Sequence, residues 1–288
     1  MSKSDSQYYE NPVLNFLRKE VLPTPFCPGC GNGIIANAFI RAVMELGYKD
    51  FNNFVFVSGI GCGAWIVSPH FKADSVHVAH GRAIPVAIGI KLAKPHLKVV
   101  VISGDGDLAN IGGNHLIHAA RRNIDMTVIL VNNMNFGMTG GQTSSMTPYG
   151  LTTITAPFGN PEHPFDISEL VYSAGAVFVA RWTTFHVHQL KNSIKKALNT
   201  QGFAFIEVIS QCPTELGRRI GMEKPSEMIQ WFIKNSIPIE RAKNMPPEEL
   251  EGKFIIGEYP TKARPSFLKS LEVIKKKAKE HLYQIAVD

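Results

Sequence analysis

Cysteine, long apolar runs and charge are all scarce in this sequence. Four cysteines in 288 residues are too few to staple a chain of this length, so a buried core must supply most of its stability. No apolar run reaches the roughly 18 residues that cross a bilayer, and the N-terminal segment lacks the apolar stretch of a signal peptide. Hydrophobic residues make up 44% and charged residues 19%, which indicates a globular protein. We therefore expect a cytoplasmic protein that contacts no membrane and keeps its cysteines reduced.

The excess of positive charge is concentrated near the C-terminus. The net charge is +6, and residues 261–284 carry seven Lys or Arg against two Glu. Such a tail could contact nucleic acid or an acidic protein, but no nucleic-acid-binding motif accompanies it. Phe267, Leu271 and Ile274 recur at helical spacing, which favours a surface helix packed on the body. We expect no nucleic-acid partner.

From about residue 32 the hydrophobic pattern alternates between the periods of helix and strand. Amphipathic stretches predict helices over 33–46, 83–93, 108–122, 166–175 and 186–199. Short, nearly continuous runs of β-branched and aromatic residues predict strands over 53–58, 97–104, 126–133, 176–181 and 203–210. Such alternation is typical of right-handed βαβ units. The expected fold class is therefore α/β, a doubly wound and mostly parallel sheet.

Two long segments show no clear period. Residues 134–165 are rich in Gly, Thr, Ser, Pro and Asn, and a loop of that length inside a compact domain is usually functional. Residues 213–265 are irregular and contain several prolines. We expect an N-terminal arm over 1–26, a cofactor-binding domain over 27–215, and a C-terminal extension over 216–288 that packs on this domain or on a partner subunit.

Two short motifs follow neighbouring strands of the predicted sheet. The strand 97–104 leads into Asp105, Gly106 and Asp107, and the next strand ends at Asn133. Because 25 residues separate Gly106 from Asn132, about one crossover helix, both motifs should reach the same carboxyl edge of the sheet. Glycine lets the backbone approach a phosphate, and a helix N-terminus favours an anion. Asp105 and Asn133 offer the oxygen ligands that Mg²⁺ prefers, so we expect a cation that bridges to phosphate.

The four cysteines are placed where one fold could gather them. Cys27 and Cys30 form a C-x-x-C turn, and Cys62 and Cys212 each follow a predicted strand. Four thiolates without a nearby histidine suit zinc or an iron–sulfur cluster equally well, and the spacing does not choose between them.

The combined motifs resemble those of a known family. The spacing of Gly-Asp-Gly and Asn-Asn is similar to that of thiamine diphosphate enzymes. Together with this spacing, the sequence over residues 20–220 resembles the β subunit of 2-oxoacid:ferredoxin oxidoreductases, above all the 2-oxoglutarate branch. The motifs that carry the resemblance are CPGCGNG, GIGC, HGRAIPVAIGIKLA, GDGDLANIGGNHLIHAARRN, NNMNFGMTGGQTS and the late Cys-Pro.

This resemblance implies three cofactors and the residues that hold them. It implies a thiamine diphosphate-binding fold with Mg²⁺ on Asp105, Asn133 and the carbonyl of Asn135. It also implies one [4Fe–4S] cluster on Cys27, Cys30, Cys62 and Cys212. Contacts to thiamine diphosphate are expected from Ile60, Gly61, Cys62, Gly63, His80, Gly106, Asp107, Gly137 and Met138.

The resemblance further implies an activity and its partners. The expected reaction is oxidative decarboxylation of a 2-oxoacid, with 2-oxoglutarate, coenzyme A and ferredoxin giving succinyl-CoA. No residue of this chain is a clear candidate for the glutamate that such enzymes place against the aminopyrimidine N1′. That glutamate is expected from an α subunit, with γ and δ subunits or a ferredoxin-like subunit as further partners. Trp65 stands where some relatives carry a basic residue, so recognition of a second carboxylate would fall to another residue or subunit.

Three alternatives differ from this interpretation. The chain could be a non-oxidative thiamine diphosphate decarboxylase or synthase with a structural Zn–Cys₄ site. It could serve the same oxidative chemistry on pyruvate or branched-chain 2-oxoacids. It could also be a binding protein that uses its basic tail on nucleic acid, which would show a steep salt dependence.

Overall fold

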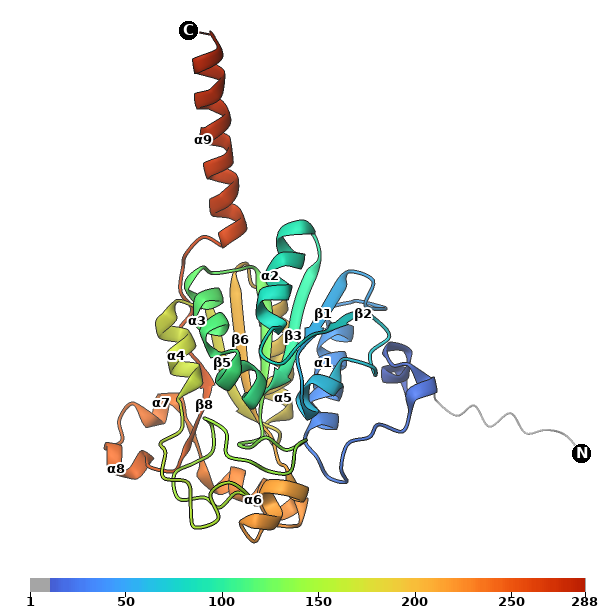
Figure 1. Cartoon of the computed structure of the whole chain (residues 1–288), viewed down its shortest axis with the longest axis vertical. Coiled ribbons are helices and arrows are strands. Elements are labelled where there is room, and N and C mark those ends of the chain that lie inside the picture. Colours follow the sequence, from blue (N-terminus) through green and yellow to red (C-terminus); the bar gives the residue numbers. More distant parts are fainter. Residues whose placement is uncertain (1–10, 288) are drawn as a thin grey trace, which may run out of the picture.

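The computed structural model describes residues 11–287, which form one sheet covered by helices on both faces (Figure 1). The strands are β1 (Phe54–Ser58), β2 (Asp74–His77), β3 (Lys98–Gly104), β4 (Met126–Asn132), β5 (Phe178–Thr183), β6 (Phe203–Ile209), β7 (Ser236–Pro238) and β8 (Phe254–Glu258). Their order across the sheet is β2-β1-β3-β4-β6-β5-β8-β7, and every neighbouring pair is parallel except β5 with β8. The expected doubly wound α/β class is confirmed.

Helices and short turns connect these strands. The helices are α1 (Asn32–Glu45), α2 (Ala83–Ala93), α3 (Gly113–Arg121), α4 (Ile167–Ala174), α5 (Val187–Asn199), α6 (Pro225–Asn235), α7 (Ile239–Ala242), α8 (Pro247–Leu250) and α9 (Phe267–Val287). Single turns are η1 (Pro12–Phe16), η2 (Lys19–Val21), η3 (Cys62–Ile66), η4 (Gly106–Ile111) and η5 (Pro213–Gly217). One core layer lies between the sheet and α1 with α5, and the other between the sheet and α2, α3 and α4.

Aromatic rings fill the layer beneath α1. Phe51 packs edge-on against Phe56 and stacks on Phe71, with ring centroids 5.0 and 5.1 Å apart. Phe39 of α1 lies over the same rings, and all four side chains are almost fully buried. Aromatic residues bury large areas and are favoured on a pleated surface, so this cluster fixes α1 against β1.

The structure departs from the sequence-based expectation in three places. The helix expected over 108–122 begins as the π-helical turn η4 and continues as α3 after Gly112. Strand β2 was not predicted, because its residues are largely exposed and show no apolar alternation. The stretch 213–265 is more regular than expected, since β7 and β8 extend the sheet. The division of the chain at residues 26 and 215 stays a prediction.

Helix α9 is attached to the body only at its base (Figure 1). The Phe267 N–H donates to the Asn123 carbonyl over 2.9 Å, and the Arg122 guanidinium lies 4.8 Å from the Phe267 ring centroid. Residues 272–282 are all exposed, including Val273 and Ile274. The first turn therefore packs on the body, and packing of the remaining described side chains on a partner subunit stays a prediction.

A buried ion cluster ties the centre of the sheet to its antiparallel edge. Arg181 of β5 donates to Glu207 of β6 over 2.6 Å, to Asp166 at the start of α4, and to the Ile255 carbonyl of β8 over 3.2 Å. Glu207 also accepts from Asn132 of β4 over 2.8 Å. A charge buried this deeply is tolerated only when it is paired and hydrogen-bonded.

We expect Arg181→Met to lower the free energy of unfolding by about 3–5 kcal/mol, because it leaves Glu207 buried without its cation. Urea unfolding followed by circular dichroism measures this change. The matched control is Lys243→Met, whose exposed pair with Glu240 contributes at most about 1 kcal/mol. An effect of Arg181→Met no larger than that of the control would contradict the assignment.

Candidate active site

The carboxyl ends of β3 and β4 deliver the two sequence motifs to one cavity. Gly104 pairs with Val131 in the parallel register, so the residues that follow each strand meet at the same edge. The cavity there has a volume of about 110 Å³. Its lining contains every residue expected to bind thiamine diphosphate or Mg²⁺, namely Ile60, Gly61, Cys62, Gly63, His80, Asp105, Gly106, Asp107, Asn133, Asn135, Gly137 and Met138.

Oxygen atoms converge beside Asp105. This carboxylate is buried, accepts from the Ser144 hydroxyl over 2.6 Å, and has its pKa raised to about 7 by burial. The Asn133 carboxamide faces both Asp105 Oδ1 and the Asn135 carbonyl, and its NH₂ would donate to them over 2.9 and 2.7 Å. With the amide oxygen turned to the same point instead, three oxygens face one another, an arrangement that a cation between them would stabilise. One carboxylate, one carboxamide and one carbonyl are a donor set that fits Mg²⁺.

The chain turns sharply between the two asparagines. Met134 adopts a left-handed conformation with φ of 60°, which is rare for a residue other than glycine. Its N–H donates to Asn132 Oδ1 over 3.1 Å, and its carbonyl accepts from the Thr147 hydroxyl over 2.7 Å. These bonds hold the strained turn that brings Asn133 and Asn135 to the same oxygen cluster.

The turn after Asn135 offers backbone N–H groups to an anion. The Phe136 N–H donates to the Gln142 carbonyl over 3.0 Å and closes the turn. Among residues 11–287, the N–H groups of Gly137, Met138 and Thr139 have no acceptor. Such a nest beside the start of η4 is suited to a diphosphate. A Cβ on Gly106 would lie 2.3 Å from the Phe136 ring, so only glycine lets these two segments approach.

Asp107 holds two loops of the cavity together. Its Oδ1 accepts from the Ile60 N–H over 3.1 Å, from the Gly81 N–H over 2.7 Å and from His80 Nδ1 over 2.6 Å. Because a carboxylate only accepts, His80 carries its proton on Nδ1. The Oδ2 atom is buried without a hydrogen-bond partner among the described residues. The sequence suggested a diphosphate contact here, whereas the structure gives this carboxylate a positioning role as well.

The four cysteines line a second cavity of about 350 Å³. Gln211 ties the C-x-x-C turn to the end of β6, because its carbonyl accepts from the Gly31 N–H and its side chain donates to the Gly29 carbonyl. Asn32 donates to the Cys62 carbonyl over 2.9 Å. The two cavities share a wall formed by Cys62, Asn133, Gly137 and Met138.

Burial raises the pKa of three of the four thiols that line this second cavity. Burial raises the pKa of Cys30 to about 12 and that of Cys62 to about 11. It also raises the pKa of Cys212, although N–H groups of Leu216 and Glu215 and the Asn135 carboxamide oppose this. Within the described part of the chain, no three His, Cys, Asp or Glu side chains are grouped so that one metal ion could be held. The four cysteines surround a shared space.

Sequence reasoning missed the residues that support these ligands. Ser144 and Thr147 lie in the loop 134–165, where composition signalled function but no position stood out. Asn32 lies two residues after Cys30, and Gln211 directly precedes Cys212. Their position beside a cysteine is the sequence signal that could have marked them. Arg219 donates to the Gly140 carbonyl over 3.1 Å and steadies the turn.

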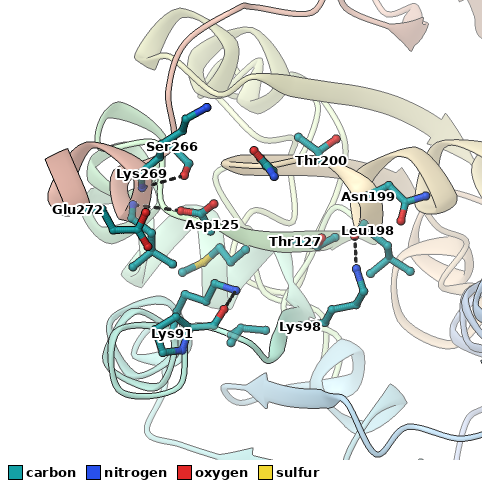
Figure 2. Close-up of a pocket in the computed structure, with 15 residues that line it drawn as sticks. Lys91, Lys98, Asp125, Thr127, Leu198, Asn199, Thr200, Ser266, Lys269 and Glu272 are labelled. Atoms are coloured by element: carbon teal, nitrogen blue, oxygen red, sulfur yellow. Dashed lines mark hydrogen bonds between the residues drawn. The ribbon is translucent and has the colours of Figure 1, made fainter.

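Another cavity of about 550 Å³ lies at the amino edge of the sheet, near the base of α9 (Figure 2). Two of its lysines are already engaged: Lys91 donates to the Pro95 and Leu97 carbonyls over 2.8 Å each, and Lys98 to the Leu198 carbonyl over 2.7 Å. Asp125 accepts from the Leu268 N–H at the start of α9. These contacts stabilise the helix base, and none of the residues singled out for cofactor chemistry lies here. No helix in the described part of the chain is long and apolar enough to span a membrane.

Comparison with known proteins points to the same edge of the sheet. Residues 59–208 match the thiamine pyrophosphate enzyme family through its C-terminal TPP binding domain. The sequence is 55% identical over 256 residues to the 2-oxoglutarate synthase subunit KorB of Methanothermobacter marburgensis, covering 89% of each chain. It is 49% identical over 269 residues to the subunit of the same name from Methanocaldococcus jannaschii, covering 93% of this chain and 99% of that one.

A solved structure is also similar over most of the chain. It is the 2-oxoglutarate:ferredoxin oxidoreductase from Magnetococcus marinus with 2-oxoglutarate, coenzyme A and succinyl-CoA bound. The TM-score is 0.82 at 32% identity, and the match covers 94% of this chain and 92% of the other.

We expect Asp107→Ala to weaken binding of thiamine diphosphate with Mg²⁺ by about 10–100-fold, because loss of an orienting residue behind a ligand site has effects of this size. Isothermal titration calorimetry measures the dissociation constant. Asp50→Ala is the matched control, since Asp50 is exposed and accepts only from Asn52. A dissociation constant within twofold of the parent would show that Asp107 does not position the cavity.

Proposed function

Because this chain belongs to the family of β subunits of 2-oxoacid:ferredoxin oxidoreductases, we propose that it carries the cofactor site of a 2-oxoglutarate:ferredoxin oxidoreductase. In the proposed reaction, 2-oxoglutarate and coenzyme A give succinyl-CoA, CO₂ and a proton, while two electrons reduce two ferredoxins. The names and bound ligands of the relatives support this choice of substrate. The observation that carries the proposal is the wall shared by the oxygen-lined cavity and the cysteine-lined cavity.

The oxygen-lined cavity is proposed to hold thiamine diphosphate and Mg²⁺. Thiamine diphosphate supplies the carbanion chemistry at its C2 atom when bound. Asp105, Asn133 and the Asn135 carbonyl would hold Mg²⁺, which the buried carboxylate and the facing oxygens support. The N–H groups of Gly137 and Met138 would orient the diphosphate.

Further residues of this cavity are proposed to shape it around the cofactor. Ile60, Gly61 and Gly63 would line the ring portion, and Asp107 keeps their loop in place through the Ile60 N–H. The same carboxylate fixes His80 with its proton on Nδ1, beside Gly106 at the start of η4. These residues therefore act by position, while the chemistry belongs to the cofactor.

The cysteine-lined cavity is proposed to hold one [4Fe–4S] cluster. Four sulfur ligands, Cys27, Cys30, Cys62 and Cys212, line it, and no histidine does. A cube of iron and sulfide separates its ligands more widely than one zinc ion, which suits a cavity of about 350 Å³ better than a single tetrahedral ion. Backbone N–H groups directed at Cys212 are the surroundings that a thiolate ligand requires.

The site is proposed to be completed by an α subunit. Among the described residues no glutamate lines the oxygen-lined cavity, so the group expected at the aminopyrimidine N1′ would come from the partner. Trp65 lines the cysteine cavity, which leaves recognition of the second carboxylate of 2-oxoglutarate to the partner as well. Onward electron transfer would use ferredoxin or a ferredoxin-like subunit, with γ and δ subunits as further members. We place the enzyme in the cytoplasm.

The first test is activity of the complex. Purified anaerobically with its partner subunits, the protein should be brown, absorb near ~400 nm and contain about four irons per chain. It should reduce ferredoxin when 2-oxoglutarate and coenzyme A are both present. Stoichiometric zinc without iron, or release of an aldehyde without any electron acceptor, would instead indicate a non-oxidative enzyme. Preference for pyruvate would overturn the substrate assignment.

A pair of variants separates the two cofactor sites. Asp105→Ala should abolish Mg²⁺-dependent binding of thiamine diphosphate while iron content stays at the parent level, because only the cation ligand is removed. Cys212→Ser should lose iron, because a hydroxyl is a poor substitute for a thiolate ligand. Each variant is the control for the other, with calorimetry and iron analysis as the measurements. Full iron retention in Cys212→Ser, or unchanged cofactor affinity in Asp105→Ala, would contradict the respective assignment.

A further inference from the structure

The four-residue turn 144–147 connects the two strand ends that carry the oxygen cluster. The Ser144 hydroxyl donates to Asp105 Oδ2 over 2.6 Å, and the Thr147 hydroxyl donates to the Met134 carbonyl over 2.7 Å. Asp105 directly follows β3, and Met134 lies in the left-handed turn after β4. All four side chains are buried. One turn therefore holds both motifs of the cation site in place.

Two further hydrogen bonds fix the direction of the Ser144 hydroxyl. Its oxygen accepts from the Met146 N–H over 3.2 Å, and the Ser144 N–H donates to Thr147 Oγ1 over 2.9 Å. The first bond uses a lone pair of the hydroxyl oxygen, and the second keeps the residue in its turn. The hydroxyl proton therefore points at Asp105, over an ordinary O–H···O distance.

The two oxygens of the Asp105 carboxylate consequently face different neighbours. Oδ2 accepts from Ser144, whereas Oδ1 lies 2.9 Å from the end of the Asn133 carboxamide. The same end of this carboxamide lies 2.7 Å from the Asn135 carbonyl oxygen. Oδ1 is thus the carboxylate oxygen directed at the oxygen cluster, while the second oxygen is engaged by the serine.

We propose that Ser144 is a positioning residue that limits Asp105 to one coordinating oxygen and thereby makes the site selective for Mg²⁺ over Ca²⁺. This inference rests on the proposed function, because it requires a divalent cation held together with thiamine diphosphate. Mg²⁺ requires a nearly octahedral set of oxygens at about 2.0–2.1 Å, whereas Ca²⁺ takes roughly six to eight oxygens at longer distances and often binds both oxygens of one carboxylate. A carboxylate with one oxygen already hydrogen-bonded suits the smaller ion and withholds a ligand from the larger one.

The test is calorimetric titration of thiamine diphosphate into the anaerobic complex, in excess Mg²⁺ and separately in excess Ca²⁺. In the parent protein, the dissociation constant should be at least about tenfold higher with Ca²⁺ than with Mg²⁺. Ser144→Ala releases Oδ2 of Asp105, so binding with Mg²⁺ should weaken by about tenfold, the lower end of the usual effect of losing a residue that orients a metal ligand. Binding with Ca²⁺ should be unchanged or tighter, so the preference for Mg²⁺ should disappear. Iron content should equal that of the parent, because the cysteines are untouched.

Two further variants separate the role of the hydroxyl from that of the turn. Ser145→Ala is the matched control, since it removes the neighbouring hydroxyl, which bonds to Asn110 Oδ1 over 3.0 Å. It should keep the ion preference of the parent. Ser144→Thr retains a hydroxyl at the critical position and should restore the preference for Mg²⁺ that Ser144→Ala loses.

Four results would overturn the proposal. The first is a parent that binds thiamine diphosphate equally well with either ion, and the second is an unchanged preference in Ser144→Ala. The third is equal weakening with both ions in Ser144→Ala, since the residue would then support the site without selecting the ion. The fourth is loss of the preference in Ser144→Thr or in Ser145→Ala, since the effect would then not depend on the Ser144 hydroxyl. Absence of cation-dependent binding of thiamine diphosphate in the parent would instead refute the proposed function.

Discussion

Parallel pairing of four adjacent strands is the constraint on which the whole site depends. In the order β1-β3-β4-β6, all four strands run in the same direction and end at the same edge. The loop after each strand carries a residue that lines a cavity: Cys62 after β1, Asp105 after β3, Asn133 after β4 and Cys212 after β6. The oxygen-lined and the cysteine-lined cavities therefore lie side by side, because the sheet brings residues that are far apart in sequence to one edge.

The framework of the site could be predicted from sequence because it depends on periodicity and chain length. The crossover of 25 residues between Gly106 and Asn132 predicted neighbouring strands, and β3 and β4 are indeed paired. Contacts between distant loops could not be predicted, since they depend on side-chain direction. Asp107 reaches back to the Ile60 N–H, and Gln211 reaches across to the Gly29 carbonyl, and no local pattern records either bond. Strand β8 could not be predicted for a related reason: its antiparallel position beside β5 depends on Arg181 and on tertiary packing.

Burial raises the pKa of acidic groups that line the two cavities. Asp105 is buried with a pKa raised to about 7, and Cys30 and Cys62 are neutral thiols at physiological pH. Burial therefore favours the neutral forms of the Asp105 carboxyl and of these two thiols over unpaired buried charges.

The shared wall makes the linings of the two cavities continuous with each other. Met134 keeps the chain in a strained turn so that the Asn133 side chain and the Asn135 carbonyl face one point. Gly137 leaves no Cβ to separate these groups. One short segment, residues 133–138, therefore contributes to the lining of both cavities. An arrangement in which the cation and sulfur ligands came from unrelated loops would hold both groups equally well but would lack this direct connection.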